Sequence, residues 1–273
     1  MVGNHDLGRG LRAEVLGVFA GAASRAGAIG LAHRAKGLTV ETKADLSPVT
    51  EADRDSEAEI RDRVRGVLGD IPVVAEESVG RGLAGFDPEK PFLVIDPIDG
   101  TKEFIEGRSE FTVNLALIRN RKPVIGVIYA PALEALYVGG GNEAWTGWLH
   151  PGQPLRAIRG QRALRCRVPA PDRVVAVASR QHLDSGTQAY LDALPGGECI
   201  YRGSSIKFCI IAEGQADLYP RFAPTSEWDT AAGEAILTAA GGALTDLDGK
   251  PMVYGKIETG FLNAGFIARG RTA

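Results

Sequence analysis

The sequence has few cysteines and no cluster of them. Cys166, Cys199 and Cys209 are the only three in 273 residues, and no two of them form a Cys-x-x-Cys pair. An odd, scattered set argues against a disulfide framework and against a metal–thiolate site, and it is typical of a reducing cytoplasm. Cys209 lies in an apolar run, so we interpret it as a small core residue. We therefore expect a cytoplasmic protein.

An excess of positive charge and a long apolar run are also missing. Lysine and arginine total 31 against 34 acidic residues, a net charge of -3, and the isoelectric point is about 5.9. This balance argues against a nucleic-acid partner but leaves room for a local cationic pocket that binds a phosphorylated small molecule. No stretch approaches the ~18 uninterrupted apolar residues of a membrane span, and the N-terminus lacks the order of a signal peptide. We expect no integral membrane contact.

Apolar periodicity predicts a layered protein. A pair of helices precedes a mostly antiparallel set of strands, and a second group of helices and strands follows the polar stretch 149–172. We expect helices near 7–33, 51–68, 182–194, 204–213 and 227–240, and strands near 71–75, 92–95, 111–118, 124–129, 136–138, 143–148, 173–179, 217–221, 243–247 and 261–268. The pattern predicts an α/β (α+β) fold, a layered αβαβα sandwich with mixed or antiparallel sheets. We expect two lobes, 1–150 and 151–273.

Two aspartates follow the apolar run 92–95. Asp96 and Asp99 flank Pro97, which cannot donate to a strand ladder, so we expect the strand to end there and the chain to turn. Carboxylates held on such a turn are suitable ligands for a hard cation such as Mg²⁺. For the two aspartates alone, a solvated turn is the simpler interpretation.

Three further acids fall at the ends of predicted elements. Glu76 follows a strand, Asp229 lies in the first turn of a helix, and Asp53 lies three residues after Thr50, the predicted N-cap of its helix. Each alone has a structural explanation, such as a cap partner or a favourable interaction with the helix dipole. Several carboxylates in one cleft would repel each other unless cations lay between them.

Three motifs containing these acids occur in a fixed order along the chain. They are Glu76-Glu77-Ser78, Asp96-Pro97-Ile98-Asp99-Gly100-Thr101 and Trp228-Asp229-Thr230-Ala231-Ala232-Gly233. With them, residues 40–270 resemble the inositol monophosphatase superfamily of Mg²⁺-dependent, lithium-sensitive phosphatases. That resemblance implies a hydrolase with two Mg²⁺ ions per chain, and a third, weaker site is an open alternative.

The residues between the motifs favour one branch of the superfamily. Inositol monophosphatases commonly read G-T-T-N-F where residues 100–105 read G-T-K-E-F-I, and three more segments, 47–50, 203–208 and 212–221, support the same branch. Together they are similar to bacterial 3′(2′),5′-bisphosphate nucleotidases. This implies removal of the 3′-phosphate of adenosine 3′,5′-bisphosphate (PAP) to give AMP, with the sulfated form PAPS as a second candidate substrate, in the clearing of a by-product of sulfate activation.

The resemblance also implies roles for individual residues. The implied metal ligands are Glu76, Asp96, the Ile98 carbonyl, Asp99 and Asp229. The implied catalytic residues are Glu76 and Thr101, which orient the attacking water, and Asp53, which assists through a third metal site or its water. The implied substrate contacts are Gly100, Thr101, Lys102, His182, Ser204, Ser205, Lys207, Arg221 and Asp229.

Alternatives remain open on the sequence alone. The chain could be a monophosphatase for inositol, histidinol or sugar phosphates, which would not need a second phosphate site. A non-catalytic, phosphatase-like scaffold is a more distant alternative, because all the motif acids are present and the net charge is negative. Ser226-Glu227 departs from the expected pattern, and we expect Glu227 to add negative charge near the site. The oligomeric state is expected to be monomer or homodimer.

Overall fold

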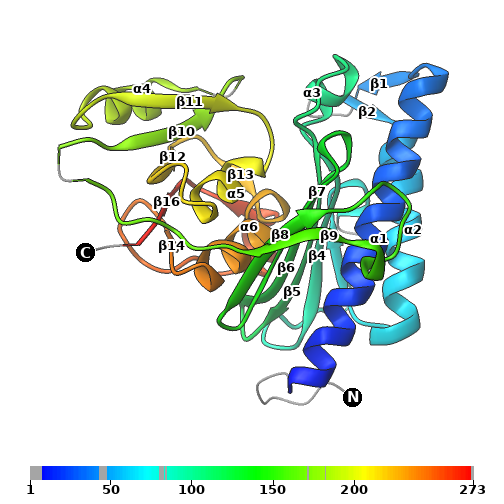
Figure 1. Cartoon of the computed structure of the whole chain (residues 1–273). Helices are drawn as coiled ribbons and strands as arrows, with labels where there is room; N and C mark the ends of the chain where they lie inside the picture. Colours follow the sequence, from blue (N-terminus) through cyan, green and yellow to red (C-terminus); the bar gives the residue numbers. More distant parts are fainter. Residues whose placement is uncertain are drawn as a thin grey trace.

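Five layers make up the fold in the computed structural model, which describes residues 8–42, 48–79, 83, 85–170, 172–181 and 183–271. Helices α1 (Arg9–Lys36) and α2 (Glu51–Leu68) cover one face of a seven-stranded sheet, and α5 (Ile206–Ala212) and α6 (Glu227–Ala239) lie between this sheet and a five-stranded one (Figure 1). Helix α4 (Ser185–Asp192) packs on the outer side of the second sheet. The predicted αβαβα sandwich is confirmed.

The two large sheets have the following strand orders. The first sheet runs β3 (Val73–Ala75), β4 (Phe92–Asp99), β5 (Thr112–Arg119), β6 (Lys122–Ala130), β7 (Ala135–Gly140), β8 (Glu143–Trp148) and β9 (Arg159–Ala163). The second runs β11 (Glu198–Arg202), β10 (Val175–Ser179), β12 (Leu218–Arg221), β16 (Phe266–Arg269) and β14 (Ala243–Thr245). Each contains parallel and antiparallel pairs, as predicted. Two short ribbons pair β1 (Val40–Thr42) with β2 (Pro48–Thr50) and β13 (Thr225–Ser226) with β15 (Leu262–Asn263).

Strand β4 is buried on both faces, which explains the continuous apolar run in its sequence. Phe92 and Val94 point into the core between the two sheets, whereas Leu93 and Ile95 point into the core beneath α1 and α2. Because successive side chains of a strand alternate between faces, a strand buried on both faces needs apolar residues at every position. The first sheet is therefore the central layer that carries the site.

The prediction that this strand ends before Pro97 is wrong. Strand β4 continues to Asp99, and its pairing with β5 shifts register between Asp96 and Asp99. A register shift leaves backbone groups outside the regular ladder, so the missing N–H of proline costs no ladder bond there. The strand β9 was also not predicted, and it adds residues beyond position 150 to the first sheet.

Helix α6 is held close to the first sheet by two glycines. Gly126 of β6 is paired with Gly139 of β7, and a Cβ atom at either position would lie 2.4 Å from the α6 backbone, at Ala232 or Ile236. The small residues of α6 and these glycines allow backbones to approach where side chains would separate them. This packing fixes the first turn of α6, and with it Asp229.

Helix α1 is the most apolar long helix of the described residues. The span Gly10–Lys36 is long and apolar enough to cross a membrane by length and composition, although half of an 18-residue apolar window within it is buried inside the fold. Val15, Phe19 and Ala26 belong to the core formed with α2 and the first sheet. Burial against α2 and the sheet accounts for the apolar character of this helix.

Candidate active site

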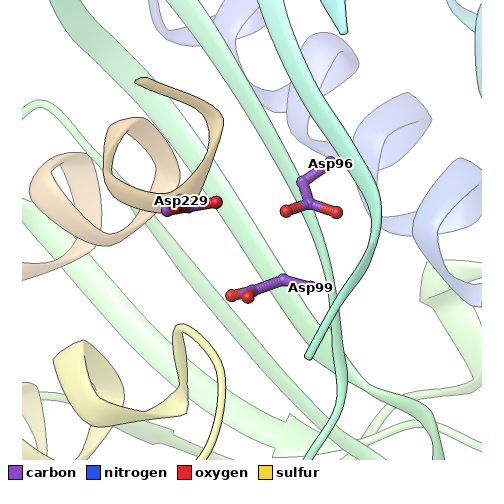
Figure 2. Close-up of side chains that lie close together, drawn as sticks. All are labelled: Asp96, Asp99 and Asp229. Carbon is purple, nitrogen blue, oxygen red and sulfur yellow. The ribbon is translucent and has the colours of Figure 1, made fainter. Parts of the chain in front are cut away.

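Three aspartates from two distant parts of the chain converge on one point. Asp96 and Asp99 come from the end of β4 and Asp229 from the first turn of α6, and their carboxylates face one another (Figure 2). One oxygen from each lies within 4.8 Å of the others, and Asp96 is buried. The structure thus brings together three of the predicted metal ligands.

Each aspartate uses one oxygen to hold its position. Asp96 Oδ1 accepts from Ile98 N (3.0 Å), Asp99 Oδ2 accepts from Ser205 N (2.6 Å), and Asp229 Oδ2 accepts from Ser226 N (3.1 Å). The further hydrogen bonds to Asp99, from Thr112, Asn114 and the Ser205 hydroxyl, and to Asp229, from the Thr225 hydroxyl, use the same Oδ2 atoms. The anchored geometry therefore leaves one oxygen of each carboxylate for a ligand.

Electrostatics at this point favour a bound cation. Burial raises the pKa of Asp96 well above its ordinary value, and the neighbouring Glu76, Asp99, Asp229 and Asp53 carboxylates raise it further. Burial and then Asp99 also raise the pKa of Asp229. A divalent cation would relieve this repulsion, and an all-oxygen donor set suits Mg²⁺. The residues present therefore fit a hard metal ion.

Glu76 and Asp53 lie at the edge of this group. Ala75 and Ile95 are paired in the parallel strands β3 and β4, so Glu76 and Asp96 follow at the same edge of the sheet. Glu76 opens the short helix η1 (Glu76–Ser78) and lines the same cavity as the aspartates, although it is not in their tight cluster. Asp53 is buried in the first turn of α2. Both lie close enough to influence the Asp96 charge.

The chain turns sharply after Asp99. Gly100 has φ = +89°, a left-handed conformation that favours glycine, and it precedes the short helix α3 (Thr101–Ile105). The Thr101 hydroxyl donates to the Ile98 carbonyl at 3.2 Å, which places two of the predicted site groups in contact. Gly100, Thr101 and the exposed Lys102 all line the cavity.

A cavity of about 830 Å³ extends from the aspartates toward the second sheet. The predicted substrate residues Ser204, Ser205, Lys207 and Arg221 line the same cavity. Lys207 is buried, donates to the Ser204 carbonyl, and has its Nζ 5.1 Å from the centre of the Tyr219 ring. Two cationic side chains, Lys207 and Arg221, which we call the cationic wall, therefore line the same cavity as the three aspartates, which we call the acidic wall.

Arg221 is only partly satisfied within the protein. Its guanidinium donates to the Pro224 carbonyl (3.1 Å), but its Nε is buried and has no hydrogen-bond partner among the described residues. A buried donor without a partner is costly, and a ligand oxygen in the cavity would supply one. The unpartnered Nε of Arg221 therefore fits an anionic ligand at the cationic wall of the cavity.

Two predicted substrate contacts need further comment. Ser205 directs both its N–H and its hydroxyl to Asp99, so this structure places it on a metal-ligand candidate. Its predicted contact with substrate stays a prediction. Ser204 has φ = +46°, which is uncommon for a residue with a side chain. His182 and Ser47 lie outside the described residues.

Sequence reasoning missed several residues that shape the site. Asn114 of β5 is paired with Asp96, and its Nδ2 donates to Asp99 (3.2 Å) and to Ser205 (2.8 Å), while its buried Oδ1 has no hydrogen-bond partner among the residues that the structure describes. Glu103 is buried in α3 and lines the cavity. A polar Asn inside the apolar run 111–118 was the available signal for Asn114, because a polar residue in a buried strand needs a reason.

The expectation that Glu227 adds charge to the site is wrong. Glu227 is fully buried and accepts from the backbone N–H groups of Gly255 (2.7 Å) and Lys256 (3.0 Å). The Lys256 ammonium lies 2.9 Å from the same carboxylate. Its charge is therefore balanced away from the cavity, and the residue fixes the chain segment 255–256 to α6.

Comparison with known proteins agrees with this geometry. Residues 11–268 match the inositol monophosphatase family. The chain is 43% identical over 232 residues, 85% of this chain and 89% of the relative, to "3′(2′),5′-bisphosphate nucleotidase CysQ" of Escherichia coli O157:H7. It is 34% identical to the protein of the same name from Buchnera aphidicola, covering 85% of this chain and 84% of the relative.

Solved structures show the same fold. CysQ from Bacteroides thetaiotaomicron, described as a bacterial member of the inositol monophosphatase family, superposes with a TM-score of 0.77 at 36% identity, covering 96% of this chain and 98% of that chain. Inositol monophosphatase from Anabaena (Nostoc) sp. PCC 7120 gives a TM-score of 0.73 at 25% identity, covering 95% and 92%. The chain belongs to the inositol monophosphatase family.

Proposed function

We propose that this chain is a metal-dependent 3′(2′),5′-bisphosphate nucleotidase of the CysQ type, which removes the 3′-phosphate of PAP to give AMP. It is a phosphoric monoester hydrolase, as its CysQ relatives are by name. PAPS, the sulfated form of PAP, is the second substrate we propose. The observation that carries the proposal is the division of one cavity between an acidic wall and a cationic wall.

The acidic wall supplies the chemistry of phosphate release. We assign Asp96, Asp99 and Asp229, together with Glu76 and the Ile98 carbonyl, to two Mg²⁺ ions. When bound, these ions supply an activated water and neutralise charge on the attacking and leaving oxygens. The protein residues hold the ligand oxygens in place through the hydrogen bonds from Ile98, Ser205 and Ser226. A third ion near Asp53 is part of the proposal.

The residues around the turn at Gly100 position the phosphoryl group that is cleaved. Thr101 lies beside Asp99 on the cavity wall, and we assign its hydroxyl, with Glu76, to the orientation of the attacking water. The backbone N–H groups of Gly100 and Thr101 are the proposed contacts to a phosphate oxygen. Lys102, exposed at the same wall, is assigned a weaker role in attracting the anion.

The cationic wall selects a substrate with a second phosphate. Lys207 is buried and Arg221 has an unpartnered Nε, so a bound phosphate would satisfy both charges and the orphaned donor. Tyr219 and Arg221 are two residues apart in β12 and therefore lie on the same face of the strand. A monophosphate has no group to occupy this wall, and this difference separates the proposed activity from that of a monophosphatase.

A phosphate-release panel tests the proposal. Purified protein is assayed with PAP, PAPS, inositol 1-phosphate and histidinol phosphate, with Mg²⁺, without Mg²⁺, and with Mg²⁺ plus Li⁺. We expect the highest kcat/KM for PAP, complete dependence on Mg²⁺ and inhibition by Li⁺. A preference for inositol 1-phosphate would overturn the nucleotide assignment, and the absence of release from any phosphate ester would overturn the catalytic one.

We also propose that the enzyme acts in the cytoplasm and that its halves form two lobes. All three cysteines lie within the described residues and none forms a disulfide there, which is compatible with a reducing compartment. The lobe carrying most metal ligands is residues 1–150, and residues 151–273 carry the cationic wall together with Asp229. Monomer and homodimer are both consistent with this arrangement.

A further inference from the structure

Glu57 is a buried acid outside the cavity that the proposed mechanism leaves without a role. It lies on the same buried face of α2 as Asp53, one turn further along the helix, and only 5% of it is exposed. A carboxylate this deeply buried must be paired and hydrogen-bonded, because a buried charge is otherwise strongly unfavourable. The hydrogen-bond partners of Glu57 therefore indicate its role.

Two of the partners of Glu57, Glu77 and Ser78, lie in the short helix η1, and the third, Arg61, contacts it. One carboxylate oxygen, Oε2, accepts from Glu77 N at 3.1 Å. The other, Oε1, accepts from the Ser78 hydroxyl and from Arg61 Nε at 2.8 Å, and Arg61 itself also donates to the Ser78 hydroxyl. Glu57, Arg61 and Ser78 thus form a closed clamp, which we call the η1 clamp.

The η1 clamp acts next to the candidate metal ligand Glu76. Strand β3 fixes the residue before Glu76, because Ala75 is paired with Ile95, and Glu57 fixes the amide directly after it. A three-residue helix has almost no internal hydrogen bonding of its own, so its position depends on such external contacts. The direction of the Glu76 side chain toward the cavity is therefore set from both sides.

We propose that Glu57 is a positioning residue that sets the affinity of the one metal site to which Glu76 contributes. The inference rests on the proposed metal role of Glu76. The aspartates Asp99 and Asp229 are anchored by Ser205 and Ser226, at a distance in the chain from the η1 clamp. Loss of the clamp therefore weakens one metal site and leaves the site made by these two aspartates unchanged.

The test variant is Glu57→Gln, with Glu59→Gln as a matched control. Gln keeps the size of Glu57 but presents an NH₂ group to donors on one side of the clamp. Glu59 lies on the same helix and forms the same type of i, i+4 pair, with Arg63, but its other partner is Arg25 of α1 and not η1. Ser78→Ala is the second variant, because it opens the clamp without removing a buried charge.

Binding of Mn²⁺ to the full chain is measured by titration calorimetry without substrate, and unfolding temperatures are recorded for each variant. We expect Glu57→Gln to weaken one Mn²⁺ site about tenfold or more, the usual effect of losing a partner of a metal ligand. The other site is expected to remain at the wild-type affinity, with a smaller one-site effect in Ser78→Ala and none in Glu59→Gln. Half-maximal phosphate release should need correspondingly more Mg²⁺, at unchanged KM for PAP.

The opposite outcomes are also defined. Wild-type affinity at both sites in Glu57→Gln, or equal weakening of both together with a lowered unfolding temperature, would overturn the positioning role. If the wild-type chain releases phosphate from PAP only with Mg²⁺, and the Glu57→Gln variant binds Mn²⁺ as the wild type does, the inference is rejected and the proposed function stands. A wild-type chain that neither binds Mn²⁺ nor releases phosphate would reject the proposed function itself.

Discussion

Helices α2 and α6 begin in the same way, although they lie at opposite ends of the chain. Each has a capping box with an aspartate at the third position: Asp53 accepts a hydrogen bond from Thr50 N (2.8 Å), and Asp229 accepts one from Ser226 N (3.1 Å). Yet only Asp229 joins the tight aspartate cluster. A carboxylate has two oxygens, so capping a helix and facing a metal ion are compatible in one residue.

The difference between the two helices lies in what they pack against. Helix α6 is pressed onto the Gly126–Gly139 pair, which directs its first turn to the end of β4. Helix α2 instead contributes Asp53 and Glu57, two buried acids that accept hydrogen bonds from Thr50 and from η1, respectively. The same capping box thus holds a proposed metal ligand in one helix and a proposed supporting residue in the other.

Replacing the two capping aspartates by asparagine should give the largest contrast. Asp229→Asn is expected to lower kcat about a thousandfold, because metal-assisted charge stabilisation is worth several kcal/mol. Asp53→Asn should cost about tenfold, as a residue that supports a metal site. Phosphate release from PAP at saturating Mg²⁺ measures both.

Stability measurements serve as the control for this pair. Asparagine keeps an oxygen that accepts the cap N–H, so neither variant should unfold in the purification buffer. Because burial and Asp99 raise the pKa of Asp229, its ionised form is disfavoured in the metal-free fold, and Asp229→Asn should be at least as stable as wild type at pH 8. Equal losses of activity in the two variants would contradict the distinction between the helices.

The cationic wall offers the next largest effect. Lys207→Ala should raise KM for PAP by about 10- to 100-fold, the value of a charge-assisted hydrogen bond, and should change KM for a monophosphate little. Lys102→Ala is the matched comparison: it removes an exposed lysine from the same cavity, and because its proposed role is to attract any anion, it should raise KM slightly and equally for both substrates. Initial-rate assays with both substrates measure the ratio. Equal increases in KM for the two substrates in Lys207→Ala would argue for a monophosphatase.

Much of this arrangement was predictable from sequence, and the reasons are local. The polar segment 120–123 between two apolar runs predicts a hairpin, which β5 and β6 form, and its first two residues, Asn120 and Arg121, have the positive φ that such a turn requires. Thr50 followed by Asp53 predicted the start of α2, which the structure places at Glu51. Turns and helix caps depend on residues only a few positions apart, so the sequence predicts them without knowledge of the rest of the fold.

Other features depend on partners far away in the chain. Pro97 predicts the end of a strand, but β5 pairs with β4 around it by shifting register. The position of Glu227 next to Trp228-Asp229 predicts a charge at the site, but Lys256, almost thirty positions later, neutralises it. Neither partner can be identified from local spacing, because only the folded chain brings it into contact.

Helix α6 also carries a partly buried acid, Glu234, that should make stability depend on pH. Burial raises the pKa of Glu234 to about 7, although the Tyr254 hydroxyl donates to it (2.6 Å) and Lys256 and Lys122 oppose the shift. A carboxyl with a raised pKa in the fold stabilises fully below its unfolded value, and this contribution is lost as pH rises through 7. We expect a loss of about 2 kcal/mol between pH 5 and pH 8.

Glu234→Gln separates this effect from the aspartate cluster. The variant keeps an oxygen for Tyr254 but cannot ionise, so its free energy of unfolding should be nearly flat where that of wild type falls. Urea denaturation at pH 5, 6, 7 and 8 in saturating Mg²⁺ measures the slope, because the bound ion holds the aspartates in one state. A variant with the same slope as wild type would show that another group is responsible.

The smallest effect, and the most direct test of the comparison, comes from the two cap residues. Thr50→Ala and Ser226→Ala each remove an N-cap hydroxyl and should each lower the free energy of unfolding by about 1 kcal/mol. They should differ in one respect only. Because the Ser226 segment orients Asp229 within the cluster, Ser226→Ala should also reduce the rise in unfolding temperature that Mg²⁺ produces, whereas Thr50→Ala should leave it unchanged. A reduced Mg²⁺ response in Thr50→Ala would place Asp53 in the metal site as firmly as Asp229, and the two helices would then be equivalent in function as well as in form.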